Sequence, residues 1–192
     1  PEYETVKNLF ETKKYGKLLS GNMSRIGSCP TRSWDGWMLD KKRSGLVPFD
    51  LHIHDLDFMV YAFGKPTKVH KFRSQRPEQD VLSAVYEYDG FYINTEAAWY
   101  ADPYPFTMTF RFQFENALAV MEKGKFKIYE SNGNITDVFA GDSENEIKVI
   151  KEYVPKSDAY ANEIRYFADC VLDGTEPDRV KPKELKTVIK IL

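Results

Sequence analysis

The chain has 192 residues, of which 42% are hydrophobic, 15% are aromatic and 29% are charged, and its formal net charge is −2. This composition is typical of a globular protein with one core, and it excludes disordered chains and strongly basic nucleic-acid-binding proteins. No apolar run approaches the roughly 20 residues that span a bilayer, and no signal peptide is visible, so we expect a cytoplasmic protein that binds neither membrane nor nucleic acid.

Helical and loop patterns fill the first third of the chain. Apolar residues at spacings of three and four predict a helix over residues 1–14, which Gly16 ends. A strand is expected over residues 18–25 and a loop over residues 28–43. Residues 56–63 are apolar almost all round, which predicts a short buried helix.

After Pro66 the hydrophobic period changes to two, which is typical of strands. The clearest strand is expected over residues 107–115, where Met108 and three phenylalanines alternate with polar side chains. Short turns separate most of the predicted strands, so their sheet is expected to be largely antiparallel. The strands are predicted over residues 68–72, 81–88, 91–100, 107–115, 118–122, 125–130 and 135–139.

Helical periodicity returns at the end of the chain. Ser157 or Asp158 is expected to cap a helix, and Pro182 is expected to start a last one. The whole pattern predicts one α+β domain over residues 1–192, with a predominantly antiparallel β-sheet and helices packed on one of its faces. The apolar face of the helix after Ser157 carries Tyr160, Ile164, Phe167, Val171 and Leu172.

The ionisable side chains of residues 50–57 lie in an otherwise apolar stretch. Buried groups of this kind need partners or a function. If the segment before the helix is extended, Asp50, His52 and His54 share one face, and a carboxylate beside an imidazole suits an oriented general base. The structural alternative is a capping carboxylate at the helix start, with histidines that backbone groups satisfy.

Asp50, His52 and His54 also resemble the opening motif of metal-dependent phosphoesterases and the His-x-His of amidohydrolases. Such sites need several further histidines from distant segments. His70 is the only other histidine in the chain, and it falls in a predicted strand. A metal-dependent hydrolase is therefore the least favoured alternative, and no metal site is assigned.

The stretch from Ser44 to Pro66 resembles the central motif of the glucose–fructose oxidoreductase / inositol dehydrogenase / rhizopine-catabolism (Gfo/Idh/MocA) family. That motif reads Gly-Gly, then Asp-x-Gly-x-His-x-x-Asp, then a buried helix and Gly-x-Pro. Ser44 and His52 replace two of its glycines. The motif's other defining positions match Gly45, Asp50, His54, Asp57 and Gly64-Lys65-Pro66.

Further matches extend the resemblance over nearly the whole chain. Residues 3–17 resemble a family helix that ends before a glycine, and Trp37 falls where a tryptophan often precedes the motif. His52, where the family has glycine, is expected either to alter substrate choice or to add a hydrogen-bond donor. The family's closing helix is matched by Tyr160, Glu163 and Phe167.

The resemblance implies one half of a two-domain, NAD- or NADP-dependent oxidoreductase. No two of the eleven glycines lie two residues apart, so the chain has no dinucleotide-binding G-x-G-x-x-G fingerprint, and that half is expected outside it. The implied reaction moves a hydride between nicotinamide and a sugar, polyol or related hydroxy compound, and this fragment alone is expected to be inactive. His54 is expected to accept or donate the substrate proton, and Asp50 to orient His54 or bind a neighbouring hydroxyl.

Aromatic side chains are candidates for the walls of the substrate site. We expect Trp37, Tyr100 and Tyr104 to contact the substrate together with His52. The resemblance also implies a homo-oligomer formed through the sheet face. The alternative from a different functional class is a non-catalytic binding or oligomerisation module of the same fold.

Overall fold

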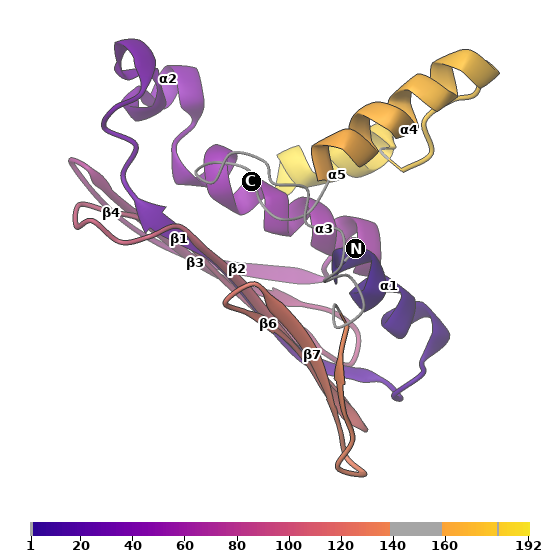
Figure 1. The fold of residues 1–192 in the computed structure, drawn as a ribbon. Coiled ribbons are helices and arrows are strands. Elements are labelled where there is room, and N and C mark those ends of the chain that lie inside the picture. Colours follow the sequence, from indigo (N-terminus) through magenta and orange to yellow (C-terminus); the bar gives the residue numbers. More distant parts are fainter. Residues whose placement is uncertain (1, 139–158, 180) are drawn as a thin grey trace, which may run out of the picture.

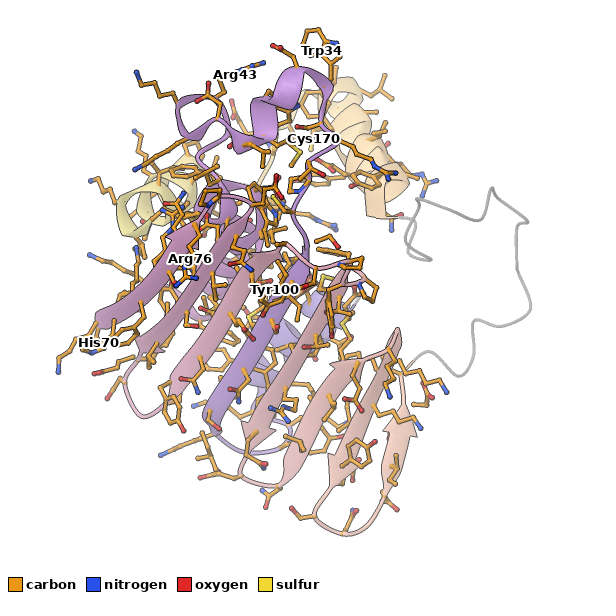
Figure 2. All side chains as sticks on the ribbon, turned by 90° about the vertical axis from the view of Figure 1, so that its left-hand side faces the viewer. Trp34, Arg43, His70, Arg76, Tyr100 and Cys170 are labelled. Carbon is orange, nitrogen blue, oxygen red and sulfur yellow. The ribbon has the colours of Figure 1, made fainter. Side chains whose placement is uncertain are left out.

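The structure is a computed structural model, and it describes residues 2–138, 159–179 and 181–192. One eight-stranded sheet forms a single layer, and the described helices lie on one side of it (Figure 1). Its other face is left open by the described residues, as Figure 2 shows. The predicted α+β fold is therefore confirmed. The expected helix cap at Ser157 or Asp158 lies outside the described residues.

The described strands follow the order β2-β3-β4-β1-β5-β6-β7-β8 across the sheet. Neighbouring strands are antiparallel, except that β1 and β4 run parallel. A parallel pair needs a long crossover connection, and residues 48–63, which hold the candidate site, lie within that crossover. The strand bounds are Leu18–Ser28 (β1), Lys68–Arg76 (β2), Gln79–Glu87 (β3), Tyr92–Tyr100 (β4), Thr107–Phe114 (β5), Ala117–Glu122 (β6), Lys125–Glu130 (β7) and Ile135–Asp137 (β8).

Both α1 and α5 pack against α3, which lies over the sheet. No helix of the described residues is both long enough and apolar enough to cross a bilayer. The helix bounds are Glu2–Thr12 (α1), Trp34–Leu39 (η1, a 3₁₀ helix), Lys41–Ser44 (α2), Pro48–His52 (η2, a π-helix), Ile53–Phe63 (α3), Ala159–Asp173 (α4) and Pro182–Ile191 (α5).

The main core lies between the sheet and the helix layer, and strand β5 illustrates how alternation builds it. Phe110, Phe112 and Phe114 point towards the helices and are at most 1% exposed. Arg111 and Gln113 alternate with them and therefore point to the open face. The helices complete this core with Val6, Leu9, Leu56, Met59 and Val188.

The structure differs from the prediction at the start of the site helix. The sequence predicted a helix over residues 56–63 after an extended segment, but the backbone is already helical at Pro48, first in η2 and then in α3. A proline suits this first position because the first N–H groups of a helix have no helical partner. The predicted loop over residues 28–43 likewise contains η1 and most of α2.

Helix α4 lies on the helix side of the sheet, but its apolar face does not pack there. The four side chains spaced along that face are between 60% and 70% exposed, and Leu172 is 83% exposed. Figure 1 shows α4 projecting outside the layer formed by α1 and α3. The four side chains are Tyr160, Ile164, Phe167 and Val171.

Candidate active site

The site helix determines which ionisable groups share a face. Because η2 and α3 continue one helical path with about 3.6 residues per turn in its α-helical part, side chains three or four residues apart lie on the same side. Asp50, His54 and Asp57 therefore form one outer face. His52 lies two residues from both Asp50 and His54, on the inner side. The expectation that Asp50, His52 and His54 share a face was wrong because it assumed an extended backbone.

The outer face is open at His54 and Asp57 and half-buried at Asp50. Burial raises the pKa of Asp50, while the positive charge of a protonated His54 and a hydrogen bond from Trp99 act in the opposite direction. Burial and the nearby carboxylate of Glu184 raise the pKa of Asp57, and His54 again opposes them. The imidazole of His54 thus lies between two carboxylates on the outer face of the site helix.

The inner face of the helix holds His52 in the protein interior. His52 is 0% exposed, and its Nε2 lies 2.5 Å from the hydroxyl oxygen of Tyr86 on β3. Burial lowers the pKa of His52 to about 4, and the charges of Lys71 and Arg25 act in the same direction. His52 is therefore neutral near pH 7, and the structure does not place it beside Asp50 and His54 as a substrate-binding residue.

A buried ion pair fixes the same inner face to the sheet. Asp55, which is 1% exposed, accepts hydrogen bonds from Nη2 and Nε of Arg25 on β1, at 2.8 Å and 3.3 Å. The same Nη2 also donates to the hydroxyl of Tyr3 on α1, at 3.2 Å. Because Asp55 follows His54 directly, this contact sets the rotation of the helix that turns His54 outwards.

A second buried carboxylate holds the start of the site helix. Asp80 on β3 accepts two hydrogen bonds from Arg73, both at 2.7 Å, and one from the backbone N–H of Val47, at 3.1 Å. Just before, Gly45 has a φ of +74°, and a Cβ there would lie 2.5 Å from the ring of Phe49. The glycine matched to the family motif therefore has a structural reason, since the chain turns tightly into η2.

The predicted aromatic walls are not all on the site's side of the sheet. Tyr100 donates from its hydroxyl to Glu96, four residues earlier on β4, at 3.2 Å, and both side chains lie on the open face. The ring centroid of Tyr104 lies 6.0 Å from that of Tyr100. Tyr100 is thus placed on the opposite face of the sheet from His54, and Tyr104 accompanies Tyr100.

Trp37 and Trp99 are better placed than Tyr100 and Tyr104 to contribute to the candidate site. Trp37 is 38% exposed on η1, and its neighbour Met38 packs against the cluster that contains Val47 and Trp99, near the Asp50 end of the site helix. Trp99 was not among the candidates from the sequence. The signal for it was the period of two in β4, which points Trp99 towards the helices and Tyr100 away from them.

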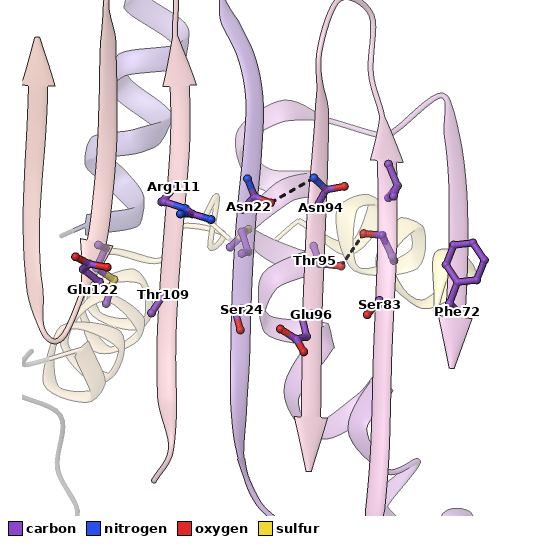
Figure 3. Close-up of a pocket in the computed structure, with 14 residues that line it drawn as sticks. Asn22, Ser24, Phe72, Ser83, Asn94, Thr95, Glu96, Thr109, Arg111 and Glu122 are labelled. Carbon is purple, nitrogen blue, oxygen red and sulfur yellow. Dashed lines mark hydrogen bonds between the residues drawn. The ribbon is translucent and has the colours of Figure 1, made fainter. Parts of the chain in front are cut away.

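A separate hollow of about 480 Å³ lies on the open face, across the middle strands (Figure 3). Asn94 Nδ2 donates to Asn22 Oδ1 within it, at 3.3 Å. Arg111 forms no ion pair with any described residue. The polar side chains that line the hollow include Asn22, Ser24, Asn94, Glu96, Thr109 and Arg111.

Among the described residues, no three histidine, cysteine, aspartate or glutamate side chains come together as a group that could hold a metal ion. The helical backbone separates His52 from Asp50 and His54, so the arrangement speaks against a metal-dependent hydrolase built on these three residues.

The fold and the family are identified by comparison. The structure is similar in fold to part of solved oxidoreductase chains. The family model for the GFO/IDH/MocA C-terminal domain matches residues 3–127. The chain belongs to this family. No curated protein matches the sequence.

Three solved structures illustrate the likeness. An oxidoreductase from Agrobacterium radiobacter in complex with NAD⁺, L-tartaric acid and magnesium has a TM-score of 0.77 and 16% identity, and the match covers 97% of this chain and 56% of that one. UDP-N-acetylglucosamine 3-dehydrogenase GnnA from Acidithiobacillus ferrooxidans has a TM-score of 0.70 and 19% identity, covering 99% and 56%. Levoglucosan dehydrogenase in complex with NADH and L-sorbose has a TM-score of 0.77 and 13% identity, covering 96% and 58%. The chain therefore spans little more than half the length of these relatives.

Proposed function

We propose that this chain is the substrate-side half of an NAD- or NADP-dependent oxidoreductase that acts on a sugar, polyol or related hydroxy compound. The observation that carries the proposal is the outer face of the site helix, where His54 is exposed between Asp50 and Asp57. Family membership and neighbours solved with NAD⁺ or NADH support a nicotinamide cofactor.

The polar side chains of the candidate site explain why the proposed reaction needs a cofactor. Asp50, His54 and Asp57 can bind hydroxyls and move protons, but none of them can accept a hydride. A bound nicotinamide would supply that acceptor. The described residues offer an exposed imidazole for the reacting end of the substrate, while the phosphates would be bound by the proposed dinucleotide-binding half.

In the oxidation direction, a ring nitrogen of His54 takes the proton of the substrate hydroxyl. The C–H electron pair leaves that carbon as hydride, and the remaining oxygen forms the carbonyl. The ionised Asp50 stabilises the imidazolium that results, and it orients the ring before the reaction. The indole N–H of Trp99 holds Asp50 in place and favours its ionised form.

The test replaces His54 in the longer protein that contains this chain. His54→Asn is expected to lower kcat by at least about a hundredfold, the usual contribution of general base catalysis, with NADH affinity unchanged. His70→Asn is the matched control, because His70 is an exposed histidine on the other face that pairs with Glu87. Equal turnover of the His54 variant and the control would remove His54 from the mechanism. Absence of turnover in the parent protein would favour the non-catalytic module.

We also propose that the protein is cytoplasmic. We further propose that a second copy of the protein binds to the open sheet face. The open face is uncovered in the described residues. Its hollow is lined by Arg111, which forms no ion pair with a described residue, and by Glu96 and Glu122. A two-fold axis would bring the same patch of each copy together. Arg111 of one copy could then pair with a carboxylate of the other.

A further inference from the structure

An apolar stripe on α4 lies exposed on the helix side of the sheet. The stripe has four side chains. They are spaced by four, three and four residues, and this spacing places them on one face of the helix. An amphipathic helix normally turns such a face towards its own core. Here all four side chains are at least 60% exposed, so the described part of the chain does not bury them. The stripe consists of Tyr160, Ile164, Phe167 and Val171.

A second face of α4 contacts the loop that follows the helix. Tyr166 accepts hydrogen bonds at its hydroxyl from the backbone N–H groups of Asp178 and Arg179, at 2.7 Å and 3.1 Å, and lies 2.7 Å from Asp178 Oδ1. Cys170, one turn further on, is buried, and its carbonyl accepts from the N–H of Thr175. Tyr166 and Cys170 share a face that is rotated by about a quarter turn or more from the stripe. The loop after α4 therefore packs against this second face and leaves the stripe uncovered.

The position of α4 limits what can cover it. The helix lies on the same side of the sheet as the site helix and projects beyond it (Figure 1). Neighbouring α5 packs on α3, and its Glu184 acts on Asp57 at the edge of the candidate active site. A body that brings a cofactor to His54 must approach from this side. The match covers 56% of each of two solved relatives, and the remainder of those chains is large enough to form such a body.

We propose that the stripe of α4 is the docking surface for the dinucleotide-binding half of the longer protein. This inference rests on the proposed function, because it takes that half as the occupant. Burying four large apolar side chains at one edge would hold the two halves at a fixed distance, and the hydrophobic effect would favour the closed arrangement.

The test measures how fast introduced cysteines react with a maleimide in the longer protein. Val171→Cys lies in the stripe and changes the side chain little, whereas Asp169→Cys lies on the opposite, exposed face of α4. The parent protein gives the background from native cysteines. Docking predicts labelling of Val171→Cys at least about tenfold slower than that of Asp169→Cys, since a buried thiol reacts only when the interface opens.

A second variant confirms that the docked half causes the protection. Adding Phe167→Asp to Val171→Cys is expected to restore fast labelling, because the new charge lies inside the interface. Equal labelling rates of Val171→Cys and Asp169→Cys would overturn the proposal. Protection that disappears on dilution would overturn it in favour of a second copy of the chain.

NADH binding and turnover, measured on the same samples, separate this inference from the proposed function. Slow labelling of Val171→Cys in a protein that binds NADH but turns over no hydroxy compound would keep the docking surface and overturn the reaction. Fast labelling in an active enzyme would overturn the docking surface and keep the reaction.

Discussion

Nη2 of Arg25 lies 2.8 Å from Oδ1 of Asp55, so a buried ion pair connects the middle of β1 to the residue that follows His54. Two charges in the interior are costly unless they are paired and hydrogen-bonded. This pair is therefore a rigid attachment that gives the site helix one orientation relative to the sheet.

Removing one charge of this pair should destabilise the domain strongly. Asp55→Asn is expected to lower the free energy of unfolding by about 3–5 kcal/mol, because Arg25 is left buried without a counter-charge. Asp35→Asn is the matched control, since Asp35 pairs with Arg43 at 3.1 Å on the surface, and it should cost less than about 1 kcal/mol. Urea denaturation measures both, and equal effects would contradict the anchoring role of Asp55.

His52 should make stability depend on pH. Its folded-state pKa of about 4 lies below the ordinary value of 6.5, so the unfolded chain binds a proton first as the pH falls. Stability attributable to His52 is fully present above pH 6.5 and is lost as the pH falls towards 4, by about 2 kcal/mol between pH 7 and pH 5.

The measurement compares unfolding of the parent and of His52→Gln at both pH values. Gln keeps a group that can bond the Tyr86 hydroxyl but cannot be protonated. Contributions of the carboxylates around His54 cancel in this comparison. A parent that loses no more stability than His52→Gln between the two pH values would show that burial does not lower the pKa of His52.

Trp99 should affect the acid limb of the pH profile of kcat/KM for the proposed reaction. Its hydrogen bond lowers the pKa of Asp50, so Trp99→Phe is expected to raise that pKa. If Asp50 must be ionised for turnover, the acid limb of the kcat/KM profile moves to higher pH, with the plateau less affected. The profile is measured in the longer protein, with Trp37→Phe as the control. An unshifted acid limb in Trp99→Phe would separate Trp99 from the ionisation of Asp50.

The open sheet face should control association. Arg111→Glu reverses an exposed charge in the hollow of Figure 3, so we expect it to weaken self-association by at least about tenfold through like-charge repulsion. Lys186→Glu makes the same charge change on α5, on the helix side, and should leave association unchanged. Sedimentation measures both variants, and identical oligomers would exclude Arg111 from the interface.

Strong periodicity made most of the fold predictable. In β5 every second residue is a large apolar side chain, and the structure confirms that strand and its neighbours. The site helix was only partly predictable. Asp50, His52 and His54 interrupt the apolar run at its start, so the hydrophobic pattern did not indicate the first two helical turns. The backbone there was instead predicted to be extended, and this error placed His52 on the same face as Asp50 and His54.

Tertiary contacts account for what the pattern could not provide. The Arg25–Asp55 pair joins residues that are 30 positions apart, and no local rule predicts such a partner. Tyr100 was predicted as a substrate contact by residue type, but its position in β4 sends it to the open face. The face of α4 was correctly recognised as apolar, but its periodicity could not show that the described part of the chain leaves it exposed.

The parallel pairing of β1 with β4 also bears on how the domain folds. Asn22 and Asn94 are hydrogen-bonded across this pair although 72 residues separate them. Such a pairing closes a long loop, and its entropy cost must be met before the new contacts form, so pairings of this kind slow folding. Since the site helix lies inside that loop, its ionisable groups reach their final positions only when the loop closes. Hairpins such as β6–β7 can form earlier, and an intermediate that contains them alone would have no assembled site.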